Sequence, residues 1–170
     1  MDERHHPTAP LLRLHLLDGF RVTRDGGPEL PEKWPRPSAR ALVKLLAVTP
    51  DHRLHREQVM EICWPGIDAQ AALGSLRVAL HAARHALEPE LAPRAASSYL
   101  VADGPMLALD PETVWIDVDR AEEAGLAALA AADKADDKAD DADLARALAL
   151  FTGDLLPEDR YEPWAEERRD

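Results

Sequence analysis

The stretch from Asp68 to Leu87 constrains the fold more than any other part of this sequence. It runs for about five helical turns without a proline, and Glu88-Pro89 then ends it. At about 100° per residue, its larger apolar side chains share one stripe and its basic side chains share another. The apolar stripe holds Leu73, Leu76, Leu80, Ala83 and Leu87, and the basic and polar face holds Gln70, Gly74, Arg77, His81, Arg84 and His85. The pattern predicts a long amphipathic helix that packs on a core and presents a basic face.

The segments around this helix predict a small mixed domain. Alternating apolar residues favour an antiparallel sheet near the N-terminus, two helices follow it, and Asp103-Gly104 is a hairpin signal. We expect Ser38 to cap the first helix. The expected strands are 11–17, 20–23, 98–101 and 106–109, and the expected helices are 38–48, 56–63 and 68–87. A sheet, three helices and a terminal hairpin describe an α+β winged helix.

The C-terminal part differs in charge and in pattern. Residues 1–110 carry 13 Lys+Arg against 14 Asp+Glu and all seven histidines, whereas residues 111–170 carry 7 against 18. Helical spacing predicts an all-α segment with helices near 118–132, 144–151 and 157–169, and Gly153 stands where a cap would end the middle one. The Asp/Lys/Ala tract 133–143 has too little apolar surface to offset ordering, so we predict a mobile linker there. We therefore place a winged-helix domain at 1–110 and an all-α domain at 111–170.

Several classes of protein are disfavoured by what the sequence lacks. Cys63 is the one cysteine, and no apolar run reaches the roughly 20 residues of a membrane span or forms a signal peptide, so we expect a cytoplasmic protein. His81 and His85 have chelating spacing, but no third ligand follows them, so we expect no metal site. No phosphate loop, catalytic triad or paired-carboxylate cleft is present. We expect neither an enzyme nor a cofactor.

The end of the chain carries apolar residues that need a partner. Leu155, Leu156, Tyr161 and Trp164 stand within the last 16 residues. We expect them to pack onto the winged helix or to drive self-association, and we expect the chain to be a fragment of a longer protein.

The order of several short motifs resembles the N-terminal part of the SARP-type antibiotic regulatory proteins of actinomycetes. Each motif is weak alone, but their order and spacing cover nearly the whole chain. They are Leu14–Phe20 (LHLLDGF), Arg40–Ala47 (RALVKLLA), Arg56–Val59, Trp64-Pro65, Ser75–Leu80 (SLRVAL), Ile116–Val118, Ala147–Glu158 (ALALFTGDLLPE), Tyr161 and Trp164–Arg168. The resemblance implies a response-regulator-type winged helix followed by the start of a tetratricopeptide-like bacterial transcriptional activator domain. It also implies that the third helix enters the DNA major groove at direct repeats beside a promoter.

This reading identifies two sets of candidate DNA contacts. The groove candidates are Arg77, His81, Arg84 and His85, and the phosphate candidates are Arg36, Arg40, Lys44 and Arg94. The resemblance places RNA polymerase against the loop with His52 and His55, although a plain exposed turn explains these residues equally well. We predict a sequence-specific regulator of double-stranded DNA. The alternative is a winged-helix interaction module that does not bind DNA, which the net charge of −12 and the hairpin without Lys or Arg favour.

Overall fold

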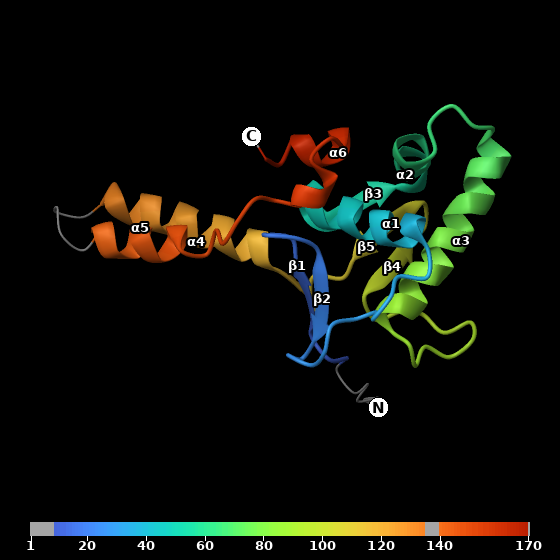
Figure 1. Ribbon diagram of the computed structural model, residues 1–170, viewed down its shortest axis with the longest axis horizontal. Coiled ribbons are helices and arrows are strands. Elements are labelled where there is room, and N and C mark those ends of the chain that lie inside the picture. Colours follow the sequence, from blue (N-terminus) through green and yellow to red (C-terminus); the bar gives the residue numbers. More distant parts are fainter. Residues whose placement is uncertain (1–8, 135–139, 170) are drawn as a thin grey trace, which may run out of the picture.

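The computed structural model describes residues 9–134 and 140–169. It is a mixed α/β structure with two small sheets (Figure 1). The strands are β1 (Leu12–His15), β2 (Arg21–Arg24), β3 (Arg53–His55), β4 (Leu100–Asp103), β5 (Met106–Leu109) and β6 (Val114–Ile116). The α-helices are α1 (Pro37–Val48), α2 (Arg56–Cys63), α3 (Ala69–Leu87), α4 (Asp117–Ala132), α5 (Asp140–Leu148) and α6 (Pro163–Glu166), and the 3₁₀ turns are η1 (Pro50–His52) and η2 (Pro157–Asp159).

Each sheet has three strands, and one pairing departs from the expected pattern. The predicted antiparallel pair near the N-terminus is present as β1 and β2, but β6 joins the same sheet parallel to β1. The second sheet has the order β3-β5-β4, and its β4–β5 pair is the predicted hairpin. Both β3 and β6 have three residues, too few to show a periodicity, so the sequence did not reveal them.

The first three helices begin and end close to where local signals placed them. Asp68 caps α3 by accepting hydrogen bonds from the backbone N–H groups of Gln70 and Ala71. The expectation for Ser38 was wrong, because α1 begins at Pro37, whose fixed φ suits the first helical position, and no side chain caps it. Helices α1 and α3 pack against each other over an apolar core.

Helices α4 and α5 lie side by side and project away from the sheets, as Figure 1 shows at the left. Their exposed apolar side chains include Leu126, Leu129 and Leu148. In the tract 133–143, for which we predicted a mobile linker, residues 135–139 lie outside the described residues, whereas Asp133 and Lys134 follow α4 and residues 140–143 belong to α5. Within the described residues, none of the helices is both long enough and apolar enough to cross a membrane.

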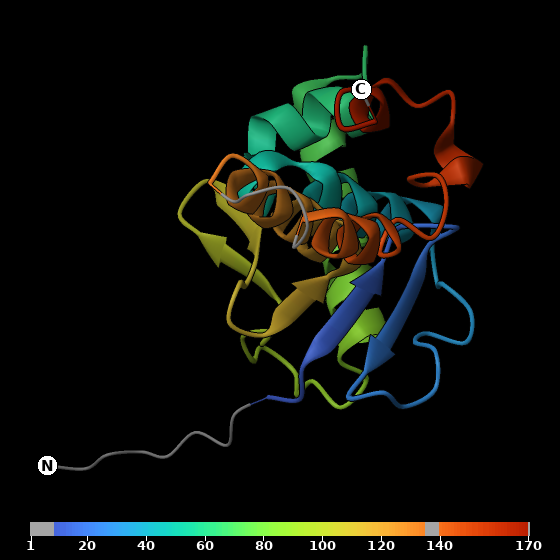
Figure 2. The same cartoon turned by 90° about the vertical axis from the view of Figure 1, so that its left-hand side faces the viewer.

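The end of the chain folds back onto the N-terminal half. Residues 154–169, called the docked segment below, form η2 and the short α6 instead of the expected single helix over 157–169. Leu155 bridges to Leu17, the Leu156 N–H donates to the Leu16 carbonyl at 2.9 Å, and α6 lies beside α1 (Figures 1 and 2). Burial of both leucines is one of the two outcomes that we predicted for this end of the chain. Tyr161 does not pack onto the N-terminal half, since 92% of its surface is exposed, and self-association through this residue stays a prediction.

Candidate nucleic-acid interface

Helix α3 presents a face without acidic side chains to the solvent. No Asp or Glu occurs between Ala69 and Leu87, so the two arginines and two histidines of the helix are not neutralised along it. The predicted apolar stripe turns inward, with Leu76, Ala83 and Leu87 buried. The exposed residues one and two turns apart define what we call the recognition face: Gln70, Gly74, Arg77, Val78 and His81. Gln70, Gly74, Arg77 and His81 belong to the predicted basic and polar face, whereas the predicted Arg84 and His85 are half-buried and the exposed Val78 was not predicted.

The two α3 histidines lie together at one end of this face. The His81 and His85 rings are 4.5 Å apart between centroids, His81 is exposed and His85 is half-buried. Among residues 9–134 and 140–169, no group of three or more His, Cys, Asp or Glu side chains is arranged to hold a metal ion.

Arg84 occupies a different position from Arg77, although the two residues are two turns apart on the same helix. Arg84 is half-buried, and its Nε donates to the Leu100 carbonyl at 3.1 Å. Burial lowers the pKa of its guanidinium from the ordinary value. Arg84 therefore ties α3 to β4, whereas Arg77 points into solvent.

Two of the predicted phosphate contacts are accessible. Arg36 is exposed at the start of α1 and lines a shallow hollow together with Gly74, Ser75 and Val78 of α3. Arg94 is exposed in the connection between α3 and β4, where its φ of 64° marks a turn. The structure thus places Arg36 next to the recognition face.

The other two predicted phosphate contacts, Arg40 and Lys44, face the docked segment. Lys44 is 3% exposed, and its ammonium lies 2.5 Å from Asp159 Oδ2 and 3.1 Å from Glu158 Oε1. Arg40 is half-buried and lies 3.4 Å from the same Glu158 oxygen. Both cations also lie over the Phe20 ring. In this arrangement Lys44 has no surface to offer a phosphate.

Two arginines lie beside the hairpin, and neither was among the DNA contacts that the sequence predicted. The exposed Arg53 of β3 lies 3.5 Å from Asp103 of the hairpin, and Arg56 Nη2 donates to the Gly104 carbonyl at 3.1 Å. Strand β3 pairs with β5, which brings both residues to the hairpin. Arg53 and Arg56 thus supply positive charge beside a hairpin that has no Lys or Arg of its own. The sequence did not reveal this position, because β3 is too short to be recognised from its pattern.

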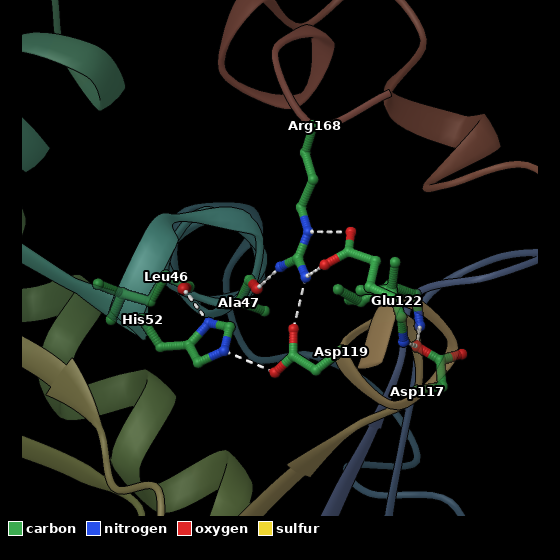
Figure 3. A network of polar contacts seen from close by, with 9 residues as sticks. Leu46, Ala47, His52, Asp117, Asp119, Glu122 and Arg168 are labelled. Carbon is green, nitrogen blue, oxygen red and sulfur yellow. Dashed lines mark hydrogen bonds and ion pairs between the residues drawn. The ribbon is translucent and has the colours of Figure 1, made fainter. Parts of the chain in front are cut away.

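His52 and His55, the predicted polymerase contacts, both have structural partners. The His55 side chain caps α2 by accepting from the Glu57 N–H, with Gln58 completing a capping box. His52 Nε2 lies 2.7 Å from Asp119 Oδ2, and its Nδ1 lies 3.2 Å from the Leu46 carbonyl (Figure 3). Burial favours the neutral ring, but the hydrogen bond and the charge of Asp119 outweigh it, so the pKa of His52 is raised.

Arg168 completes this network from the other end of the chain. As Figure 3 shows, its guanidinium donates to Asp119, to both carboxylate oxygens of Glu122 and to the Ala47 carbonyl. These contacts join α1, α4 and the docked segment. Sequence reasoning missed Arg168, because the three carbonyl or carboxylate groups it meets are 46 to 121 residues away along the chain.

Comparisons with known proteins show the fold alone. No protein-family model matches the sequence, and no curated protein matches it. Among solved structures, a chain of Mycobacterium tuberculosis EmbR, in complex with a low affinity phosphopeptide, is similar to this chain with a TM-score of 0.69 and 19% identity. The match covers 93% of this chain but 40% of the EmbR chain, so this chain spans less than half of the length of that protein chain. The likeness shows that this chain shares the fold of the matching part of the EmbR chain.

Proposed function

We propose that this chain is the DNA-binding portion of a SARP-like transcription regulator that reads double-stranded DNA with α3. The observation that carries the proposal is the recognition face: a long helix, packed on the core by one side, whose other side is solvent-exposed, basic and free of carboxylates. A helix of this kind fits the major groove and meets no like-charge repulsion from phosphates along its length.

The finer architecture that we propose follows the resemblance. Residues 1–110 form a response-regulator-type winged helix, in which β4 and β5 are the wing. Residues 111–170 begin a tetratricopeptide-like activator domain. The packing of α4 against α5 supports this part of the proposal, because such domains are built from pairs of neighbouring helices. The likeness to EmbR over 93% of the chain supports the overall fold on which this proposal rests.

Within this interface the residues have different proposed roles. Arg77 and His81 contact base edges, because they are the two exposed basic residues of the recognition face. Arg84 positions the helix against the wing and His85 flanks the groove. Arg36 and Arg94 contact phosphates, and the structure adds Arg53 beside the wing. We leave Arg40 and Lys44 out of the interface because Glu158 and Asp159 engage them.

Two further features of the proposal come from the resemblance: the regulator binds direct repeats near a promoter, and it contacts RNA polymerase through the loop that carries His52 and His55. Because the sequence has neither a signal peptide nor a catalytic motif, we also propose that the regulator is cytoplasmic and has no enzymatic activity or cofactor. The exposed residues of this loop are Pro50, Asp51 and Arg53, and we expect Pro50 and Asp51 to make the polymerase contact in place of the half-buried His52 ring.

The test is a binding series with double-stranded DNA. Fluorescence anisotropy with sites selected from a random library, repeated from 50 to 300 mM salt, is expected to show salt-sensitive affinity. Replacing Arg36 with Ala is expected to weaken all sequences similarly and to reduce the salt slope by about one. No salt-sensitive affinity for selected or genomic DNA would overturn the proposal.

A protein-interaction module is the second candidate function. It is favoured by the absence of Lys and Arg from the hairpin and by the acidic balance of residues 111–170. The same binding series separates the two, because an interaction module has no salt-sensitive DNA affinity and is indifferent to replacement of Arg77.

A further inference from the structure

A hollow that no residue of α3 lines lies at the α1–α2 connection. Its volume of about 630 Å³ lies within the range of small-molecule sites. The hollow is bounded by the end of α1, η1, α2, the first turns of α4 and the docked segment. The hollow therefore exists only when the docked segment lies against α1, η1 and α4.

One wall of this hollow is apolar and partly open to solvent. Leu45, Val48 and Leu54 form its inner part, Ile62 is 39% exposed and the Trp164 ring is half-buried. The Trp164 Nε1–H is already used, since it donates to Glu162. This wall offers an aromatic ring and aliphatic surface to a ligand.

The polar wall favours a cation over an anion. The two basic side chains that line the hollow are His52 and Arg168, and their ring and guanidinium nitrogens are already bonded to Asp119, Glu122 and backbone carbonyls. Two exposed carboxylates line it as well, Asp51 and Glu167, and neither has an ion-pair partner within residues 9–134 and 140–169. An anion finds no unused positive charge in this wall, whereas an ammonium group finds two carboxylates.

From this combination we infer that the hollow is a binding site for a small organic cation with an apolar body, whose ammonium group pairs with Asp51 and Glu167 while its body packs on Ile62 and Trp164. The arrangement of an aromatic ring beside carboxylates also suits cation–π contact. Because the ligand touches both η1 and the docked segment, its binding stabilises their contact by mass action. The inference does not depend on DNA binding.

The test uses the full chain and three matched probes: 4-phenylbutylammonium, the neutral 4-phenylbutan-1-ol and the anion 4-phenylbutanoate. Each is titrated while the backbone and tryptophan N–H signals are followed by NMR. The ammonium probe is expected to shift the Trp164 and Ile62 signals and to bind at least fivefold more tightly than the alcohol, with the anion weakest. Equal binding of the three probes, shifts elsewhere, or no binding at millimolar concentration would overturn the inference.

A double variant isolates the charge contribution. Asp51→Asn with Glu167→Gln keeps the shape, and Asn tolerates the φ of 57° at position 51. We expect this variant to bind the ammonium probe no better than the alcohol. The matched control, Glu29→Gln with Glu32→Gln, removes the same charge from exposed residues elsewhere and is expected to bind like the wild type. Unchanged affinity of the first variant would contradict the inference, since neither of its substitutions touches the core.

Discussion

The recognition face of α3 and the outward face of α1 are both basic, yet the structure uses them differently. Arg77 on α3 is exposed, whereas Lys44 on α1 is buried beneath the docked segment. The difference arises from Asp159, which lies 115 residues away from Lys44 in the sequence and 2.5 Å away in space. A basic side chain on a helix is therefore available for DNA only when no carboxylate from a distant part of the chain pairs with it. Substitutions on α3, on α1 and in the docked segment can test this comparison.

The largest effect is expected from Leu156→Ala in the docked segment. Leu156 is fully buried, so the cavity left by the substitution is expected to lower the free energy of unfolding by about 2–5 kcal/mol. Urea denaturation measures this loss. The control is Leu126→Ala on α4, where 69% of the side chain is exposed and a change within about 0.5 kcal/mol is expected. Equal effects of the two variants would mean that the docked segment adds nothing to the core.

The next effect is expected from Arg168→Met, which keeps the aliphatic stem but removes the charge. Asp119 and Glu122 then lose their shared partner in a partly buried site, and a loss of about 2–3 kcal/mol is expected in the same assay. Arg120→Met is the control, because its pair with Glu123 is exposed and such pairs contribute less than about 1 kcal/mol. A loss as small as that of the control would contradict the role of Arg168 in joining α1 and α4.

At the recognition face, Arg77→Ala is expected to cost about 1–3 kcal/mol of affinity for a selected DNA site with little change in stability. Lys44→Met is expected to do the reverse, lowering stability while DNA affinity stays within about twofold. Anisotropy and urea denaturation on the same samples measure both. A weaker salt slope for Lys44→Met would show that the docked segment opens when DNA binds, and would break the comparison.

Gly153→Ala tests how closely the chain approaches β1 and its following turn. A Cβ at position 153 would lie 2.8 Å from the Asp18 Cβ, so the backbone must shift at an expected cost of about 1–2 kcal/mol. Gly125→Ala on α4 meets open space and is expected to raise stability by about 0.5–1 kcal/mol. Opposite signs in thermal or urea unfolding are expected, and a stabilising Gly153→Ala would contradict the close contact.

The smallest effect concerns pH. The raised pKa of His52 means that its bond to Asp119 adds stability at low pH, where the ring is charged in both states, and that this stability is lost as the pH rises through the folded-state pKa above 6.5. The contribution is expected to be below about 1 kcal/mol. Comparing wild type with His52→Gln between pH 5.5 and 8.5 should show the wild-type advantage shrinking with pH. A constant difference would contradict this coupling.

Local signals in the sequence were enough for the helices and the hairpin that carry the candidate site. Asp68 and Glu88-Pro89 bound α3 within a residue of its ends, Arg56–Cys63 is α2, and Asp103-Gly104 turns the hairpin. The split of α3 into a buried stripe and an exposed basic face was also predicted, because both follow from a helix of 3.6 residues per turn packed on one side.

Gly153 was assigned the wrong role by the local rule that a glycine caps the end of a helix. We expected it to end a helix, but α5 ends at Leu148 and Gly153 instead lies against Asp18. Similarly, the helix expected over 157–169 is broken into η2 and α6. In both places, contacts with the N-terminal half determine the backbone conformation. A local sequence pattern cannot reveal these contacts, because the contacting residues are far away along the chain.

The sequence by itself determined the helices and the hairpin, because their hydrogen bonds and their apolar periodicity involve residues only a few positions apart. The tertiary structure alone decided the parallel β1–β6 pair, the position of the docked segment, and which cations stay free: Arg77 exposed, Arg84 tied to Leu100, and Lys44 and Arg168 paired with distant carboxylates. For the docked segment and its ion pairs, the physical reason is the burial of Leu155 and Leu156 on the core, a long-range event that offsets the entropy of closing loops of more than 100 residues.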